Sequence, residues 1–337
     1  MLYRRMKKAR LDLSILGFGC MRLPVTADGK IDESQAAEML RYAIDQGVNY
    51  IDTAYPYHNG ESEPFLGRAL QGGYRERIQL ATKLPIWMVQ SRADMDRYLN
   101  EQLKRLQTDH IDFYLVHGLM NPFWEKLLEM GITDFLDDAL ADGRIKYAGF
   151  SFHDELPLFK KIVDDYDWTF CQIQYNFMDE QYQAGTEGLR YAADRGLGIV
   201  IMEPLRGGML TKDIPSINSI WKKAEVQRSP AEWALRWVWN HPEVTVVLSG
   251  MSSLEQVRQN VAYAEDGLSD SLSREELDLF KEAEVEYKKR IKVPCTGCRY
   301  CMPCTSGVSI PECFEMYNQG CMFEAPDVAG INYNLSL

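Results

Sequence analysis

Amphipathic stretches with helical spacing alternate along the chain with short apolar runs from about residue 31. In the first stretch, DESQAAEMLRYAIDQG, the side chains of Met39, Leu40 and Ala43 fall on one helical face, and Asp32 can cap the helix. A longer stretch, WEKLLEMGITDFLDDAL, predicts a single helix over residues 124–140. The runs between such stretches, for example IDFYLVH and FCQIQYN, contain many β-branched and aromatic residues and predict strands.

Counting SILGFGC as the first strand, the pattern comprises eight strand–helix units. Strands that alternate with helices predict a parallel sheet, and eight such units predict a closed (β/α)8 barrel. A doubly wound open sheet is the second alternative. That fold usually carries a G-x-G-x-x-G turn after its first strand, and the sequence has no such turn. We therefore predict the barrel.

The composition indicates a globular protein, with 46% hydrophobic and 26% charged residues. The formal net charge of −12 argues against a nucleic-acid partner, because phosphate binding needs a cationic surface. No run approaches the roughly 20 apolar residues that a membrane span requires, so no membrane association is expected. Asp12 and Ser14 interrupt the apolar run near the basic N-terminus, which we interpret as mature protein rather than a signal peptide. The expected location is the cytoplasm.

The chain changes character after Asn260, where the charged stretch SREELDLFKEAEVEYKKRI predicts one long helix that ends before Pro294. A cysteine-rich segment begins directly afterwards. We place a domain boundary near residue 291, which separates a barrel of residues 1–290 from a helical, cysteine-rich tail of residues 291–337.

Five of the eight cysteines lie between residues 295 and 313, too close together to connect distant elements by disulfides. This clustering indicates metal ligation in a reducing compartment. A tetrahedral zinc site usually takes two C-x-x-C pairs separated by a longer loop, whereas evenly spaced cysteines are typical of ferredoxin clusters. The uniform two-residue gaps therefore favour a [4Fe–4S] cluster over zinc. The predicted ligands are Cys295, Cys298, Cys301 and Cys304.

Polar residues stand where the predicted barrel strands end. Asp52 follows the second strand, Lys83 the third and His117 the fourth, and Tyr57 lies in the loop that Asp52 opens. Barrel enzymes carry their chemistry on this rim, so these four residues are the candidate catalytic group. Each has an ordinary structural explanation when taken alone, and Tyr55 is a rival phenol two residues before Tyr57.

With these motifs the chain resembles the aldo-keto reductase family. The segments that carry the resemblance are IDTAYPYHNGESEPFLGRAL, LATKLP, YLVHGL, GFSFHD, QIQYN and LSGMSSLEQVRQN, in the order that the family has them. They cover roughly residues 13–265. Asp52, Tyr57, Lys83 and His117 match the catalytic tetrad of that family one for one, which implies a nicotinamide-dependent reductase of aldehydes or ketones.

Hydride delivery to a carbonyl carbon builds charge on the oxygen, which needs a proton and a dipole in a dry site. The resemblance makes Tyr57 the proton donor and Lys83 the cation that tunes it, because a nearby ammonium favours the phenolate and lowers the pKa of a phenol. Asp52 would anchor Lys83 as its ion-pair partner. His117 would orient the carbonyl oxygen as a neutral donor.

The resemblance also implies a nicotinamide cofactor across the same rim. Ser151, Gln174 and Tyr175 match the positions that hold and stack the nicotinamide. The pyrophosphate would lie along the residues after the seventh strand, and the adenosine end beside the start of the following helix. The remaining implied cofactor-binding residues are Gly19, Met21, Glu203, Pro204, Leu205, Gly207, Ser249, Gly250, Met251, Ser253, Gln256, Gln259 and Asn260.

The sequence departs from the family pattern in two segments. Phe152 stands where an Asn that can bind the carboxamide is usual. Gly250, Ser253 and Gln256 stand where NADPH-preferring members often carry Lys or Arg, which leaves Arg258 as the nearby cation for a 2′-phosphate. We expect NADP(H) from the family at large, with NAD(H) as the alternative.

The tail resembles the first half of the ferredoxin-like segment that ends a subset of this family. Thr305 replaces the usual proline after the fourth cysteine, and the second cysteine run of that subset is missing before Leu337. Cys304, Cys313 or Cys321 would then supply the fourth ligand, or the sequence is truncated. Such a tail would suit a redox protein as partner, and it keeps open a second function, that of a redox-sensing or regulatory nicotinamide-binding subunit.

Overall fold

The computed structural model describes residues 1–336, and the chain divides into two compact units. Unit 1 comprises Met1–Pro204 and Leu235–Ser271, and unit 2 comprises Leu205–Ala234 and Leu272–Leu337. The domain boundary predicted near residue 291 lies inside unit 2 and stays a prediction. None of the helices in residues 1–336 combines the length and hydropathy that a bilayer span needs.

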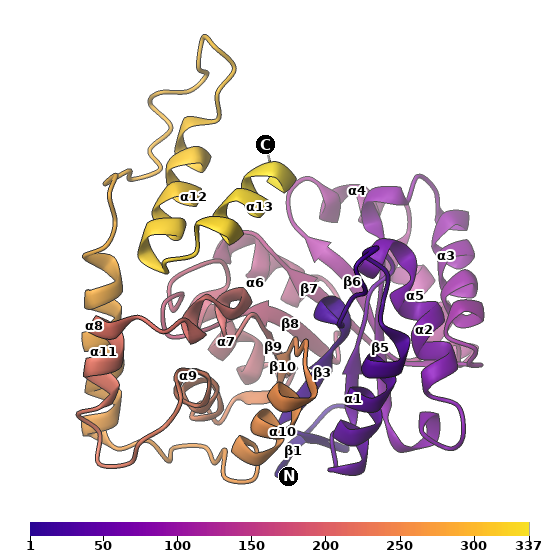
Figure 1. Ribbon diagram of the computed structural model, residues 1–337. Coiled ribbons are helices and arrows are strands. Elements are labelled where there is room, and N and C mark those ends of the chain that lie inside the picture. Colours follow the sequence, from indigo (N-terminus) through magenta and orange to yellow (C-terminus); the bar gives the residue numbers. More distant parts are fainter. Residues whose placement is uncertain (337) are drawn as a thin grey trace. The chain divides into compact units, whose positions relative to one another are not determined.

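Unit 1 contains a closed barrel of parallel strands in the order β10-β3-β4-β5-β6-β7-β8-β9, as the sequence pattern predicts (Figure 1). The strands follow one another in chain order around the barrel, and β10 closes it by pairing with β3 through Val247 and Leu16. The barrel strands are β3 (Leu16–Gly19), β4 (Tyr50–Asp52), β5 (Gln79–Leu84), β6 (Ile111–Leu119), β7 (Ile145–Phe152), β8 (Phe170–Gln174), β9 (Gly198–Met202) and β10 (Val244–Ser249).

Helices connect successive strands, as the alternating pattern predicts. Asp32 caps the first helix by accepting a hydrogen bond from the Gln35 amide, which confirms the predicted start of that helix. The helices that belong to unit 1 are α1 (Glu33–Asp45), α2 (Ser62–Ala69), α3 (Arg92–Arg105), α4 (Phe123–Glu129), α5 (Ile132–Ala141), α6 (Leu156–Asp165), α7 (Gly185–Asp194) and α10 (Leu254–Tyr263). Helix α9 (Pro230–Trp239) contributes residues to both units.

The single helix predicted over residues 124–140 is wrong. The structure has two helices there, α4 and α5, separated at Gly131. Gly131 adopts a left-handed conformation with φ of 78°, which glycine accepts readily and which interrupts a right-handed helix. The apolar periodicity continues through Gly131, so the break between α4 and α5 cannot be predicted from the sequence pattern alone.

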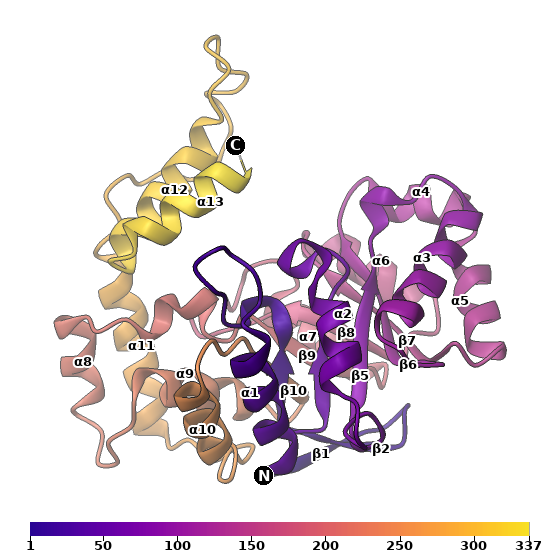
Figure 2. The ribbon, with the colours of Figure 1, turned by 45° about the vertical axis from the view of Figure 1, so that its right-hand side comes forward.

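A hairpin of β1 (Tyr3–Met6) and β2 (Leu11–Ser14) precedes the barrel and is missing from the sequence-based prediction. Its Met6 and Leu13 are fully buried in the same cluster as the inward-facing aromatic residues of the barrel. A Cβ on Gly198, at the start of β9, would lie 2.4 Å from the Met6 side chain, so the hairpin packs closely on the amino ends of the strands. Figure 2 shows β1 and β2 beneath those strands.

Unit 2 consists of helices and connecting segments. A capping box between Ser273 and Glu276 begins α11 (Arg274–Lys288), which confirms the predicted long charged helix. Phe280 of α11 packs edge-on against Trp221 and Trp233, which stack on one another. The other helices of this unit are α8 (Pro215–Trp221), α12 (Ile310–Met322) and α13 (Pro326–Ser336), and α12 and α13 pack together in both views (Figures 1 and 2).

Candidate active site

Three of the four residues predicted for catalysis lie at the carboxyl ends of adjacent barrel strands, and the fourth lies in a turn after one of them. Asp52 is the last residue of β4, Lys83 lies one residue before the end of β5, and His117 lies near the end of β6. Tyr57 opens the short 3₁₀ turn η2 (Tyr57–Gly60), which follows β4. Since parallel neighbours end on the same rim, the fold brings the four side chains to one mouth of the barrel.

Lys83 and Asp52 form a buried ion pair. The Lys83 ammonium lies 2.7 and 2.8 Å from the two carboxylate oxygens of Asp52 and donates to the Thr53 carbonyl at 2.6 Å. The side chains are only 1% and 3% exposed, so the lysine depends on these partners for its charge. Burial alone would lower the pKa of Lys83, but Asp52 and the neighbouring Tyr57 phenol raise it above its ordinary value.

Tyr57 lies against this ion pair. The Lys83 ammonium is 5.2 Å from the centre of the Tyr57 ring. Burial raises the pKa of the Tyr57 phenol because a dry site disfavours the phenolate, and the Lys83 charge opposes that rise. The net pKa shift is upward. The lowered pKa expected from the Lys83 charge alone is therefore wrong, because that expectation leaves out the cost of burial.

His117 is held as a neutral imidazole. Burial and the charges of Lys83 and His153 keep the pKa of His117 well below its ordinary value. The ring lies 6.4 Å from the Tyr57 ring and 5.2 Å from the Trp87 ring, measured between centres. Its Nδ1 atom is buried and has no hydrogen-bond partner among residues 1–336. A neutral imidazole retains one N–H donor, and His117 lines the cavity described next, which fits the predicted role of orienting a carbonyl oxygen.

A cavity of about 540 Å³ opens beside these groups and includes Tyr57 and His117 in its lining. The rest of its wall is mainly apolar, with Trp87, Met120 and Phe123 among the contributing side chains. Its size and lining are those of a site for a small organic molecule.

The rival phenol Tyr55 is engaged elsewhere. Its hydroxyl donates to Glu101 at 3.1 Å and accepts from Arg105 at 3.0 Å, both on α3. It is absent from the cavity lining, to which Tyr57 belongs. The geometry therefore distinguishes two phenols that the sequence alone leaves open.

Two of the three residues predicted at the nicotinamide lie at neighbouring strand ends. Ser151, on β7, is buried and accepts a hydrogen bond from the Gly118 amide at 2.7 Å. Gln174, the last residue of β8, donates to Asp179 at 3.0 Å. These contacts fix both side chains near the mouth of the barrel.

Tyr175 is placed differently from the stacking position expected for it. Its ring lies 5.0 Å from the Trp237 ring and 5.2 Å from the His241 ring, and its hydroxyl shares a hydrogen bond with Thr186 at 2.7 Å. The structure thus packs Tyr175 among aromatic side chains outside the barrel. Phe152, which departs from the family pattern, is fully buried.

The residues predicted at the adenosine end gather where β10 leads into α10. Ser249 accepts a hydrogen bond from Asn260 at 2.9 Å, and both side chains are buried. Ser253 caps α10 by accepting from the Gln256 amide, and Gln256 in turn accepts from the Ser252 amide at 2.8 Å. The start of this helix is therefore well ordered by its own side chains.

Other predicted cofactor residues differ in exposure. Met251 is buried, whereas Met21 is 60% exposed and contributes to the wall of the mouth cavity. Gln259 donates to Glu255 within α10 at 2.9 Å. The structure thus presents Met21, rather than Met251 or Gln259, to the mouth of the barrel.

Gly19 and Gly250 lie where β3 and β10 meet; Gly19 is buried and Gly250 is exposed. A Cβ on Gly19 would lie 3.4 Å from the Ser249 carbonyl oxygen, and one on Gly250 would lie 3.2 Å from the Arg22 side chain. The exposed Gly250 backbone, beside the Arg22 side chain and shortly before the start of α10, fits a phosphate of a dinucleotide. Arg22 is a cation that the sequence analysis missed, while Arg258 lies over the Tyr42 ring at 5.6 Å.

The remaining predicted cofactor residues fall on both sides of the division between the units. Glu203 and Pro204 belong to unit 1, and the Glu203 carbonyl accepts from Asn176 at 3.2 Å. Leu205 and Gly207 belong to unit 2, where Leu205 precedes the turn η5 (Arg206–Thr211) and Gly207 has a φ of 66°.

The comparisons with known proteins identify the family. Residues 15–278 match the sequence profile of the Aldo/keto reductase family. The chain belongs to this family. The match confirms the (β/α)8 barrel and assigns the chain to an enzyme family of oxidoreductases; it ends before the cysteine-rich tail.

Individual relatives agree with this assignment. The NADH-specific methylglyoxal reductase of Escherichia coli (strain K12) is 26% identical over 288 residues, which cover 72% of this chain and 87% of the relative. The holo form of aldo-keto reductase AKR11C1 from Bacillus halodurans superposes with a TM-score of 0.70 at 26% identity, covering 84% of this chain and 96% of that one. An aldo/keto reductase from Klebsiella pneumoniae, solved in complex with NADP and acetate, gives a TM-score of 0.68 at 25% identity, covering 84% and 95%.

This aldo-keto reductase holds Gln174 through residues that the sequence analysis missed. Asp179 accepts from both Gln174 and Asn176, the latter at 2.9 Å, so one carboxylate anchors two amides at the end of β8. Met202, at the end of β9, pairs in register with Gln174. The segment QYNFMD contains Gln174 and Asp179, but it does not by itself predict their hydrogen bond, because Asn and Asp are also ordinary turn residues.

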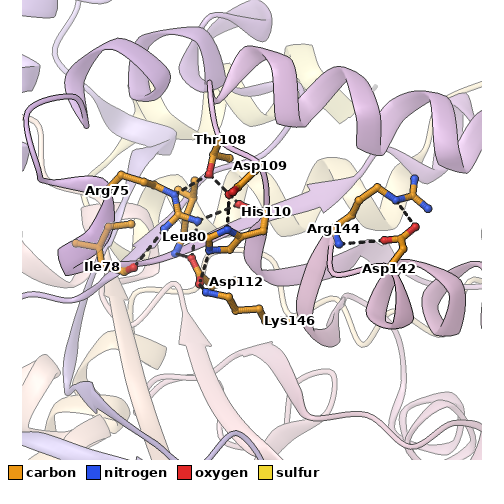
Figure 3. A network of polar contacts seen from close by, with 10 residues as sticks. All are labelled: Arg75, Ile78, Leu80, Thr108, Asp109, His110, Asp112, Asp142, Arg144 and Lys146. Atoms are coloured by element: carbon orange, nitrogen blue, oxygen red, sulfur yellow. Dashed lines mark hydrogen bonds and ion pairs between the residues drawn. The ribbon is translucent and has the colours of Figure 1, made fainter.

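A larger cavity of about 860 Å³ lies at the other end of the barrel, among Arg75, His110, Asp112 and Lys146. Figure 3 shows these side chains in one network around the Asp112 carboxylate. They stand at the amino ends of β5, β6 and β7, whereas Asp52, Lys83 and His117 lie at the carboxyl ends. The larger cavity is therefore separate from the candidate active site.

The predicted iron–sulfur site in the tail is not supported. Cys295, Cys298 and Cys301 are exposed and Cys304 is partly buried, all as free thiols. Within residues 1–336, no group of three or more His, Cys, Asp or Glu side chains is arranged to hold a metal ion. The cysteines as they lie do not fit a cluster.

Proposed function

We propose that this protein reduces an aldehyde or ketone to the alcohol, with a reduced nicotinamide cofactor as the hydride donor. The observation that carries the proposal is the buried Lys83–Asp52 pair in contact range of Tyr57, with a neutral His117 at the same mouth. These are the groups that a carbonyl oxygen needs when it gains charge in a dry site.

When bound, the nicotinamide supplies the hydride that reaches the carbonyl carbon. Tyr57 donates its phenolic proton to the carbonyl oxygen as that oxygen gains charge. Lys83 then stabilises the phenolate left on Tyr57, and Asp52 keeps Lys83 charged. His117, which lines the cavity, orients the oxygen before transfer as a neutral donor. Bulk water re-protonates Tyr57 after the alcohol leaves.

We propose NADP(H) as the cofactor, with NAD(H) as the alternative. The exposed backbone at Gly250 and the capped start of α10 support a dinucleotide in either case. Arg22 beside Gly250 adds a cation for a phosphate group. The relatives include a reductase named as NADH-specific and one solved with NADP, so both cofactors belong in the same assay.

Replacing Tyr57 by Phe tests the proposal. The Y57F protein should lose carbonyl reduction by about 10²-fold or more while its affinity for the nicotinamide, measured by fluorescence, stays unchanged. The matched control is Y55F, which removes a hydroxyl that binds Glu101 and Arg105 and should retain activity. A panel of aldehydes, ketones and quinones with NADPH and with NADH provides the substrates.

Two outcomes would contradict the proposal. Full activity in Y57F would remove Tyr57 from the chemistry. A folded wild-type protein that binds nicotinamide but turns over no carbonyl would favour the regulatory alternative instead.

A further inference from the structure

A buried carboxylate outside the mouth cavity has no part in the chemistry proposed above. Glu63, in the first turn of α2, is fully buried. Its Oε1 atom accepts hydrogen bonds from the Thr82 hydroxyl and from Gln102 Nε2, both at 2.7 Å. Its Oε2 atom lies 3.5 Å from Arg105. Burial raises the pKa of Glu63, so a carboxylate in such a dry place is unfavourable, and apolar packing would avoid that cost.

Glu63 is connected by hydrogen bonds to the β5 backbone that carries Lys83. Thr82 and Lys83 are consecutive in β5, so their side chains point to opposite faces of the strand. Lys83 faces Asp52 inside the barrel, while Thr82 faces Glu63. Gln102 binds Glu63 and also donates to the Lys83 carbonyl at 3.0 Å. Through Thr82 and Gln102, Glu63 therefore fixes the segment of β5 from which the Lys83 side chain projects.

Ser62, the residue before Glu63, contacts Thr53, whose carbonyl also binds the Lys83 ammonium. The Ser62 hydroxyl shares a hydrogen bond with the Thr53 hydroxyl at 2.8 Å, and both side chains are fully buried. The Thr53 carbonyl in turn accepts from the Lys83 ammonium at 2.6 Å. Two consecutive residues of α2 thus fix both backbone segments that surround Lys83.

From this geometry we propose that Glu63 is a positioning residue that sets the place of the Lys83 ammonium relative to Tyr57. The inference rests on the proposed function, because it concerns the proton donor of that reaction. Gln102 transmits the effect and is itself held by the Tyr114 hydroxyl at 2.9 Å. The charged and titratable groups facing Glu63 are Arg105 from α3 and Tyr114 from β6.

The effect on the reaction follows from the role of Lys83. When Glu63 is replaced by Ala, Lys83 is held less firmly, and its charge stabilises the Tyr57 phenolate less. The phenol becomes a weaker acid, so reduction slows. Because reduction needs the protonated phenol, the alkaline limb of the rate profile moves to higher pH. A displacement of about 1 Å at a catalytic group costs up to about 10²-fold in rate.

The test compares E63A with two matched variants. E63Q keeps the acceptor oxygen for Thr82 and Gln102 and should restore most of kcat. L66A removes a fully buried side chain from the same helix and disturbs packing alone. We expect E63A to lower kcat by about ten- to a hundredfold and to move the alkaline limb upward, with little change in KM or in cofactor affinity. L66A should lower the unfolding temperature without moving that limb.

The measurements are kcat and KM between about pH 6 and pH 11, cofactor affinity, and the unfolding temperature of each variant. An identical pH profile for E63A and L66A would show that Glu63 is only structural and would overturn the inference. Should E63A fail to fold, T82V removes one donor to Glu63 and should shift the limb in the same direction by less. An unshifted limb in T82V overturns the inference as well.

The wild-type and Y57F assays separate this failure from a failure of the proposed function. Suppose that wild type reduces a carbonyl, that Y57F does not, and that the alkaline limb of E63A is unshifted. This result rejects the role of Glu63 and leaves the proposed function standing. If wild type reduces no carbonyl, the proposed function fails and this inference falls with it.

Discussion

His117 illustrates how a single residue is tuned by its surroundings. Its imidazole is buried near Lys83 and His153, and these three influences all lower its pKa. At its ordinary pKa of about 6.5 the ring would be largely neutral at pH 8 and largely charged at pH 5. In the folded protein the charged form appears only at much lower pH, because a second cation beside Lys83 is unfavourable.

We therefore predict that His117 contributes no titration to carbonyl reduction between about pH 6 and pH 8. The wild-type rate should be flat over this range when measured at saturating substrate and cofactor. A limb with a midpoint near 6.5 that disappears in H117Q would contradict the prediction. His110, on a surface loop before β6, provides the control: H110Q should leave the profile unchanged.

For single residues, the sequence predicts which side chains are catalytic candidates better than it predicts their pKa values. Asp52, Lys83 and His117 could be found because polar residues at the ends of apolar strands are unusual. The upward pKa shift of Tyr57 could not be found, since it depends on burial that a linear pattern does not reveal. Arg22 escaped notice because its significance comes from Gly250, more than 200 positions away in the chain.

Among the secondary-structure elements, three barrel strands are joined at their amino ends by one carboxylate. Asp112, on β6, is 1% exposed and accepts from the Leu80 amide of β5 at 3.0 Å. It also pairs with Arg75 at 2.8 Å and with Lys146 of β7 at 2.8 Å. Figure 3 shows these contacts converging on Asp112. The carboxylate thereby links neighbouring strands at the end of the barrel away from the chemistry.

We predict that D112N destabilises the protein by about 3 kcal/mol, because it leaves two cations beside a neutral, buried group. Urea unfolding followed by circular dichroism measures the change. D142N is the matched control, since Asp142 pairs with Arg144 at a far more exposed site and should cost less than about 1 kcal/mol. Equal losses in the two variants would show that the Asp112 network adds little.

The prediction of elements succeeded where the hydrophobic period was regular. Strands such as 111–119 stand out as apolar runs, and their order predicts the barrel. The hairpin β1–β2 was missed because only Met6 is buried in β1, amid Arg4 and Arg5, so alternation is not visible there. The break at Gly131 was missed because one glycine in a helical pattern is usually tolerated.

On the scale of the whole molecule, the family relationship and the cysteine-rich tail have different support. The family match covers residues 15–278, and the barrel explains the pattern that led to it. The tail begins beyond the match, so its ferredoxin-like character rests on cysteine spacing alone. Spacing specifies which thiols could meet at a metal, but it does not specify the backbone path that would bring them together.

The eight thiols should therefore fall into two classes of reactivity. Cys20 and Cys171 are fully buried, and burial raises the pKa of both thiols, which suppresses the reactive thiolate. The other six cysteines lie in the tail and are exposed or partly buried. We predict that iodoacetamide modifies the six tail cysteines in the native, metal-free protein, whereas Cys20 and Cys171 react only after denaturation. Peptide mass spectrometry identifies the sites.

The same labelling decides the cluster prediction when it is repeated after anaerobic incubation with iron and sulfide. Because a metal-bound thiolate is no longer available as a nucleophile, cluster formation should protect Cys295, Cys298, Cys301 and one further tail cysteine. Visible absorption and EPR of the same sample would identify the cluster. Protection by zinc in a colourless protein would replace the iron–sulfur assignment with a zinc site. Labelling of all six cysteines at unchanged rates would reject metal binding by the tail.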